Sequence, residues 1–560
     1  MTDAVRLHSG RRKRMALFTP GLLVALACAP APAPAPPPSP AAAPSLMAGL
    51  GTHHHPIATS LPEAQRWFDQ GFALVFSFNH EEAVRSFQRA AELDPKAPMP
   101  WWGVAWALGP NYNLDIDDPR SKQASEAIAK ARALVAGGAD VEREYIEAML
   151  LRYSPDPKAD RPALAKQYSQ AMRDLARRHP DDVDAATLYA ESLMNLRPWK
   201  LWSLDGKPAP DTDTIVGVLE SVLRRVPNHL GANHFYIHAV EASTNPARAL
   251  ASAGRLETLA PAAGHLVHMP AHIYARTGDQ AAAAKANLAG AEADRAYLKN
   301  APPGGFYGMA YYSHNLHFLA DSEMMQGRFA EAKKAADELA ASLTPHVGMM
   351  PMGESMVLGP TNVLLRFGKD ADVLALAAPP TTLPVLTAWW HFARGVAFAR
   401  TGKSDEAAKE RAALDAAITT VPDGALFGGT GLESAKTVLA IARTALDARI
   451  AAARGARDES VVLWTRAVAD ADRLSYDEPP VWFYPIRESL GAALLAAGKA
   501  AEAERVFRDD LDRHPRNARA LFGLHASLTT QRKEIDAAWI RRAFDEAWKN
   551  ADTTLTLEAF

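Results

Sequence analysis

The chain has 560 residues, about three to four times the usual length of one domain, so we expect several domains or one long repeat array. Aromatic residues (8%) and charged residues (22%) occur at levels normal for a globular protein, which excludes a disordered chain. One cysteine excludes a disulfide framework, and a formal charge of −3 leaves no large basic field for nucleic acid. One residue type is in excess, since the sequence contains 18 histidines.

Residues 1–28 have the pattern of an export signal. Four basic residues at 11–14 precede an apolar run at 15–27 that is too short for a permanent membrane span. The following Ala-Leu-Ala-Cys at 25–28 resembles a bacterial lipobox, with alanine where leucine is commoner at position 25. We therefore predict an exported lipoprotein of the bacterial envelope, facing the periplasm and attached to the membrane only through Cys28. A soluble secreted protein and an uncleaved anchor are the alternatives.

Residues 29–60 are predicted to be a tether and linker. Eight prolines mixed with alanine at positions 29–44 favour an extended, polyproline-like spacer. His53, His54 and His55 follow, and we interpret them as part of a polar linker in preference to a metal-binding strap.

A repeat of 34 residues organises the chain from residue 61 onward. In residues 64–97, repeat positions 4, 8, 20, 24, 27 and 32 hold Trp67, Gly71, Ala83, Phe87, Ala90 and Pro95. The register recurs at 388–421 and 484–517, and it resembles the tetratricopeptide repeat, in which small residues let two helices approach. We predict an all-α tetratricopeptide-type solenoid of roughly ten helix pairs. Its parts are an N-terminal array at 61–345, an insertion with a methionine-rich start at 346–387, and a C-terminal array at 388–560.

Seven histidines fall at equivalent positions of the repeats that begin at 230, 264 and 313. Position 2 holds His265 and His314, position 5 holds His234, His268 and His317, and position 9 holds His238 and His272. These positions lie on one stripe of a helix. In tetratricopeptide repeats that stripe lines the concave groove, so the resemblance implies that all seven face a common hollow. Glu241 at position 12, and Glu191 in the repeat from 183, would join them.

Two imidazoles at i and i+4 on a helix can bind one divalent ion, and two such pairs occur here on helices expected to be neighbours. We predict a transition-metal site formed by His234, His238, His265, His268, His272, His314, His317 and Glu241. Imidazole suits copper or zinc, and the methionine-rich stretch at 346–356 resembles segments of exported copper-handling proteins. The alternatives are methionines that only pack over the groove, and a polar groove that hydrogen-bonds an extended peptide.

Several segments resemble a bacterial family of exported tetratricopeptide repeat proteins with recurring histidine motifs. They are GTHHHPI (51–57), NHFYIHAVEAS (233–243), GHLVHMPAHIYARTGD (264–279), HNLHFL (314–319) and WHFARGVAFA (390–399). The resemblance covers nearly all of the chain after the signal, and it implies a fold but no reaction.

Three functions stay open at this point. The first is an envelope-anchored scaffold whose groove binds a metal, with a protein or peptide as partner. The second is a metalloenzyme with Glu241 or Glu191 as general base and Tyr236 or Tyr274 beside a copper ion. The third is a metal-free interaction scaffold. The chain has no H-E-x-x-H, G-x-S-x-G or P-loop motif, which disfavours an enzyme. The other histidines are expected to be surface or hydrogen-bonded residues, namely His8, His179, His229, His514 and His525.

Overall fold

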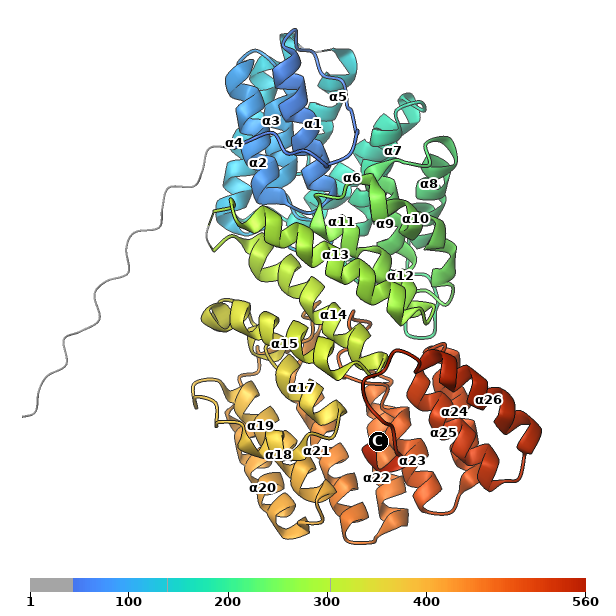
Figure 1. Cartoon of the computed structure of the whole chain (residues 1–560). Coiled ribbons are helices and arrows are strands. Elements are labelled where there is room, and N and C mark those ends of the chain that lie inside the picture. The colour runs from blue at the N-terminus through green and yellow to red at the C-terminus, as the bar shows by residue number, and fades with distance from the viewer. Residues whose placement is uncertain (1–43, 138, 303) are drawn as a thin grey trace, which may run out of the picture. The chain divides into compact units, whose positions relative to one another are not determined.

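The computed structural model describes residues 44–560, except residues 138 and 303. The predicted export signal, Cys28 and most of the predicted tether lie outside the described residues. Within them the chain folds as an all-α helical-repeat solenoid, as predicted (Figure 1). None of the helices in residues 44–560 combines the length and the apolar character that a membrane span requires.

In the first half of the chain, consecutive helices pack against one another in chain order. These helices are α1 (Pro62–Phe76), α2 (His80–Leu93), α3 (Met99–Leu108), α4 (Asp118–Leu134), α5 (Asp140–Leu150), α6 (Arg161–Arg178), α7 (Val183–Met194), α8 (Thr212–Arg225), α9 (Leu230–Val240), α10 (Leu250–Leu259), α11 (Gly264–His268), α12 (Pro270–Arg276) and α13 (Gln280–Leu298). Pro270 separates α11 from α12, because proline has no N–H to continue the helical hydrogen bonds.

The second half continues the stack after a π-helical turn, η3 (Gly308–Tyr312). Its helices are α14 (Ser313–Met325), α15 (Phe329–Leu343), α16 (Gly353–Met356), α17 (Gly359–Arg366), α18 (Asp370–Ala375), α19 (Pro384–Arg400), α20 (Ser404–Thr420), α21 (Ala435–Ala453), α22 (Arg457–Ala471), α23 (Arg487–Ala496), α24 (Ala500–Arg513), α25 (Ala518–Thr530) and α26 (Glu534–Ala547). Two short antiparallel strands, β1 (Leu426–Phe427) and β2 (Glu433–Ser434), pair between α20 and α21. The segment 346–387, expected as an insertion, contains α16–α18, and α17 packs against α15 and α19.

Glycine and phenylalanine at fixed repeat positions explain how the helices approach. Phe87 lies between Gly71 and Gly103, where an added Cβ would come within 2.6 and 2.5 Å of its ring. Phe507 lies in the same way between Gly491 and Gly523. A buried ring therefore fills the space that the missing side chains leave between three helices.

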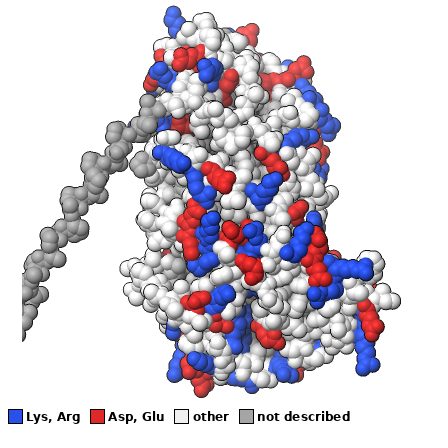
Figure 2. All heavy atoms as spheres, viewed as in Figure 1, with Lys and Arg blue, Asp and Glu red and all other residues white. Residues whose placement is uncertain are grey.

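The N-terminal helices return on themselves, so α9 packs against α1. A Cβ on Gly231 of α9 would lie 2.4 Å from the ring of Phe76, the last residue of α1. The two largest hydrophobic clusters lie in residues 50–311 and 358–560, and the two halves of the chain touch where Arg516 donates to the carbonyl of Thr277 at 3.0 Å. On the face seen in Figure 2, basic and acidic side chains are interspersed, as the nearly balanced charge predicts.

Substitution of Gly491 by alanine tests the packing of Phe507. The new Cβ would lie 2.4 Å from the Phe507 ring, so the helices must shift, and we expect a loss of about 1–3 kcal/mol in the free energy of unfolding. Gly254→Ala in α10 is the matched control, because its Cβ would meet no atom within 4 Å and alanine favours the helix by about 1 kcal/mol. Chemical denaturation of both variants is the measurement. Equal changes in the free energy of unfolding for the two variants would contradict the close packing of Phe507 against Gly491.

Candidate metal centre

Six of the seven predicted histidines lie in one continuous cluster at α9, α11, α12 and α14. Five are buried, with exposed fractions of 0–2%, and His314 is half-buried. The distances between ring centroids are 4.9 Å for His234 and His265, 5.7 Å for His238 and His272, 5.6 Å for His265 and His268, and 4.7 Å for His268 and His314. Equivalent positions of consecutive repeats therefore do bring these side chains together.

The histidines are enclosed, and the expectation that they line an open hollow is corrected. Phe78, directly after α1, covers His234 and His265 with ring centroids at 4.5 and 5.2 Å. Tyr112 covers His238 at 5.2 Å. These rings come from the start of the array, which the return of α9 to α1 brings over the histidines.

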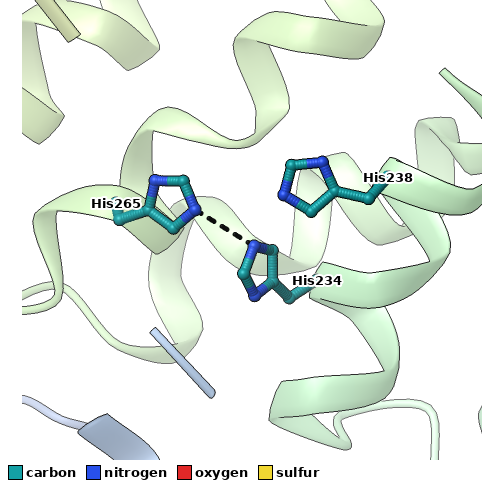
Figure 3. A group of neighbouring side chains, drawn as sticks. All are labelled: His234, His238 and His265. Carbon is teal, nitrogen blue, oxygen red and sulfur yellow. Dashed lines mark hydrogen bonds between the residues drawn. The ribbon is translucent and has the colours of Figure 1, made fainter. Parts of the chain in front are cut away.

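The first histidine set consists of His234, His238 and His265 (Figure 3), each of which offers a ring nitrogen within 4.8 Å of the others. His234 Nε2 lies 3.1 Å from His265 Nε2. His238 Nε2 and His265 Nδ1 are buried without a hydrogen-bond partner. A buried imidazole lone pair without a donor is costly, so the set offers vacant nitrogen atoms to a ligand.

The second histidine set consists of His268, His272 and His314, and it meets the same distance criterion. His268 Nε2 lies 2.9 Å from His272 Nε2. The His314 ring lies 4.7 and 5.5 Å from those of His268 and His272. The three rings therefore converge from α11, α12 and α14.

Hydrogen bonds at Nδ1 fix which nitrogen of each ring carries its proton. The carbonyl oxygen of Phe76 can only accept, so His234 Nδ1, at 2.7 Å, is the donor. The carboxylate of Glu241 likewise accepts from His238 Nδ1 at 2.7 Å. In the neutral form both rings then present an Nε2 lone pair, which is the arrangement found in metal-binding histidines.

In the second set, too, oxygen atoms that can accept a proton face Nδ1 of two rings. The amide oxygen of Asn287 faces His268 Nδ1 at 2.5 Å, and Glu241 Oε2 approaches His272 Nδ1 to 2.5 Å as a charge contact outside hydrogen-bond geometry. Two neutral Nε2 lone pairs facing at 2.9 Å repel each other, so this pair requires a proton or a metal ion between them.

Glu241 is the electrostatic centre of the cluster. Burial favours its neutral form, but the charges of His272 and His238 and the hydrogen bond from His238 outweigh burial and lower the pKa of Glu241 to about 2. Burial also opposes charge on His272, yet Glu241 raises its pKa above the ordinary value. Glu241, predicted as a ligand, contacts the Nδ1 side of both rings, opposite Nε2.

Burial holds the remaining rings neutral. It lowers the pKa values of His234, His265, His268 and His314 well below the ordinary value, and that of His238 less far. Neutral imidazole is the form that binds metals, so these rings need no deprotonation before binding.

An acidic segment from the second half of the chain lies beside the second set. Tyr476 donates a short hydrogen bond to Glu478, and its hydroxyl lies 3.5 Å from Glu241 Oε2. Burial raises the pKa values of Asp477 and Glu478 to about 7. The sequence offered no signal for this segment, because it lies some 235 residues after Glu241.

Some predicted residues do not join the cluster. His317 falls in neither set, and burial lowers its pKa to about 4. Glu191 bonds Asn195 at 2.7 Å and lies 4.0 Å from Arg152. The tyrosines expected beside a copper ion have other partners: Tyr236 donates to Glu220 at 2.6 Å, and Tyr274 donates to Glu257 at 2.5 Å. Tyr112 and Tyr311 contact histidine rings of the cluster, and the Tyr476 hydroxyl lies near Glu241.

The methionine-rich stretch packs as part of the protein interior. Met350 and Met352 lie against a cluster that contains Leu316 and Leu339, and Met356 is buried within it. Met349 is 65% exposed. Interior packing therefore accounts for Met350, Met352 and Met356 but not for Met349.

A further group, not predicted, surrounds Asp184 of α7. His55 Nδ1 lies 2.7 Å from Asp184 Oδ2, and His229 Nε2 and His53 Nε2 lie 3.0 and 3.2 Å from Oδ1. We call these four residues the Asp184 cluster. The sequence predicts a polar linker for His53 and His55 and a surface or hydrogen-bonded role for His229, and His229 is indeed hydrogen-bonded.

The hydrogen bonds of His229 argue against a metal ion in the Asp184 cluster. The backbone N–H of Ala232 donates to His229 Nδ1 at 3.1 Å, so the neutral ring carries its proton on Nε2, which faces Asp184. That proton occupies the lone pair that a metal would need. The cluster therefore fastens residues 53–55 to α7 and α9 through hydrogen bonds.

Comparison with known proteins assigns the chain to no family. No family model matches the sequence, and no curated protein matches it. Among solved structures, human IFIT1 with m7Gppp-AAAA is 11% identical with a TM-score of 0.33, and the match covers 87% of this chain and 91% of that one. Yeast Tom70 is 10% identical with a TM-score of 0.28 and coverages of 86% and 92%. The P58(IPK) TPR domain is 10% identical with a TM-score of 0.21 and coverages of 84% and 99%. Such low scores carry no functional inference.

Replacement of Asp184 by asparagine tests the Asp184 cluster. Burial opposes charge on both groups, but the histidines hold the pKa of Asp184 well below its ordinary value, and Asp184 raises the pKa of His55. The stabilisation that comes from ionised Asp184 is lost as pH falls through its lowered pKa. The stabilisation that comes from protonated His55 is lost as pH rises through its raised pKa. We expect Asp184→Asn to cost about 3–5 kcal/mol at pH 6 and less at pH 9.

Urea denaturation at the two pH values measures this difference. His54→Ala is the control, because the side chain is 59% exposed and faces Asp69. If the cost of Asp184→Asn did not change with pH, the charged pair of Asp184 and His55 would contribute nothing to the free energy of unfolding.

Proposed function

We propose that this helical-repeat protein binds two transition-metal ions, zinc or copper, one in each histidine set. The observation that carries the proposal is the convergence of one ring nitrogen from each of three histidines in each set, with the Nδ1 atoms of His234, His238 and His268 held by acceptors from Phe76, Glu241 and Asn287. Hydrogen bonding at the far nitrogen orients a ring for coordination and makes it a better ligand. Three histidines are a sufficient protein ligand set for a zinc ion.

The spacing within the sets suits such ions. Nitrogens about 2.0–2.1 Å from one ion are about 3.4 Å apart. The two Nε2 pairs, at 3.1 and 2.9 Å, need to open by only a few tenths of an ångström. Imidazole is a ligand for both copper and zinc, and the donor set alone does not select between them.

Glu241 couples the two sets, because one buried carboxylate contacts His238 of the first set and His272 of the second. We assign it as a positioning residue. Protons and metal ions compete for the imidazole nitrogens of His272, so metal affinity should fall as pH decreases.

A metal-dependent enzyme is the second candidate. The observation that favours it is the pair of buried carboxyl groups, Asp477 and Glu478, beside the second histidine set. A peptide-binding scaffold without metal is the function left if the histidine sets bind no ion.

We also propose that the protein is an exported lipoprotein, on the basis of the sequence at 11–28. Cys28→Ser should abolish labelling by radioactive palmitate and release the protein from the membrane fraction. Unchanged labelling would exclude Cys28 as the attachment site.

Substitutions at Glu241 and the histidines test the metal proposal. Glu241→Gln keeps the volume but removes the charge, so we expect metal affinity to fall about 10–100-fold. His238→Ala combined with His272→Ala removes one ligand from each set and should abolish tight binding. Competition with a chromophoric chelator measures affinity, and circular dichroism checks that the helices persist.

Glu257→Gln is the control for Glu241, because Glu257 bonds Tyr274 outside the cluster. Unchanged affinity in Glu241→Gln would refute its positioning role. Full metal uptake by the folded double histidine variant would refute the site itself.

A further inference from the structure

The two histidine sets differ in their walls. Rings enclose the first set: Phe78, Tyr112 and Tyr311 lie 4.5–5.2 Å from its imidazoles. An ion there would be surrounded mainly by aromatic rings and imidazole. This wall leaves its ion little access to a further polar ligand.

The second set has a polar and less filled wall. Phe318 covers one side, with ring centroids at 5.7 and 5.2 Å from His268 and His272. His314 is half-buried, whereas the three residues of the first set are at most 2% exposed. Access to the cluster is therefore greatest at His314.

A glycine turn forms the wall at His314. Gly428 and Gly429 belong to the turn between β1 and β2. The Cβ position of Gly429 lies 3.9 Å from His314 Nδ1 and 3.3 Å from Asp477 Oδ1. The missing side chain thus leaves space between an imidazole of the second set and a buried carboxyl group.

The acidic segment completes this side of the second set. Asp477 accepts from the backbone N–H of Thr430, at 3.2 Å, and so is fixed to the glycine turn. Glu478 is fixed by Tyr476, whose hydroxyl also lies near Glu241. Both carboxyl groups interact electrostatically with His272. Two buried carboxyl groups that can hold a water or hydroxyl group therefore lie beside the second set, whereas aromatic rings cover the first set.

We propose that the ion of the second set is the reactive one, with an open coordination position between His314 and Asp477 that takes water or another small hydroxylic ligand. Asp477 and Glu478 bind and orient that ligand. The inference rests on the proposed function, and it assigns the first set to a structural ion.

Azide binding to the copper(II)-loaded protein tests which ion has the open position, with cobalt(II) as the probe if zinc is preferred. Azide produces a ligand-to-metal absorption band when it coordinates copper(II). His265→Ala should keep one ion, in the second set, and its azide affinity should stay within about threefold of wild type. His314→Ala should keep one ion, in the first set, and show no azide band.

Azide binding by His314→Ala, or its loss in His265→Ala, would overturn this inference while leaving the metal proposal intact. Failure of the wild-type protein to bind any ion would overturn the metal proposal itself. Metal content by elemental analysis separates the two failures.

A second variant tests the space at the glycine turn without touching a ligand. Gly429→Val fills the gap between His314 and Asp477, so azide affinity should fall at least about tenfold while both ions stay bound. Gly424→Val is the matched control, because a Cβ there would meet no atom within 4 Å. Unchanged azide affinity in Gly429→Val, with the copper content of wild type, would contradict an open position at this turn.

A third variant tests the acidic segment. Glu478→Gln removes a carboxylate beside the open position, so at pH 8 azide, an anion, should bind about tenfold more tightly. Glu459→Gln on the exposed surface of α22 is the control. If Glu478→Gln left the azide affinity unchanged, Glu478 would not act at the open position.

Discussion

The ionised carboxylate of Glu241, buried to 1% exposure, is the constraint on which the centre of the molecule depends. A buried charge is tolerated only with partners, and its partners are His238 on α9 and His272 on α12. These histidines occupy the same position in consecutive repeats. The carboxylate therefore fixes the relative register of two repeats, and it orients one imidazole in each histidine set.

The repeat architecture supplies the other conditions for this centre. The last carbonyls of a helix have no partner within the helix, and the carbonyl of Phe76 at the end of α1 accepts from His234 of α9. That bond exists because the array returns on itself, so that α9 packs against α1. The same return brings Phe78 over the first histidine set. The proposed metal chemistry thus takes place in the interior of the solenoid.

The sequence predicted the helical repeat and the grouping of His234, His238, His265, His268, His272 and His314, because both follow from a period of 34 residues. It failed where contacts depend on the superhelical path of the chain. Asp184 meets His55 across 129 residues, and Tyr476 meets Glu241 across 235. No spacing rule connects such positions. Burial was missed for the same reason, since the groove closes only when α1 and α9 pack.

The central claim is that two buried ions are each held by three imidazoles. Anomalous diffraction at the metal absorption edge, from crystals of the loaded protein, tests it most directly. The account predicts two peaks, one inside each histidine set, about 2.0–2.1 Å from the coordinating ring nitrogens. Peaks only at surface sites, with the six histidines in the same positions and no density between them, would contradict it.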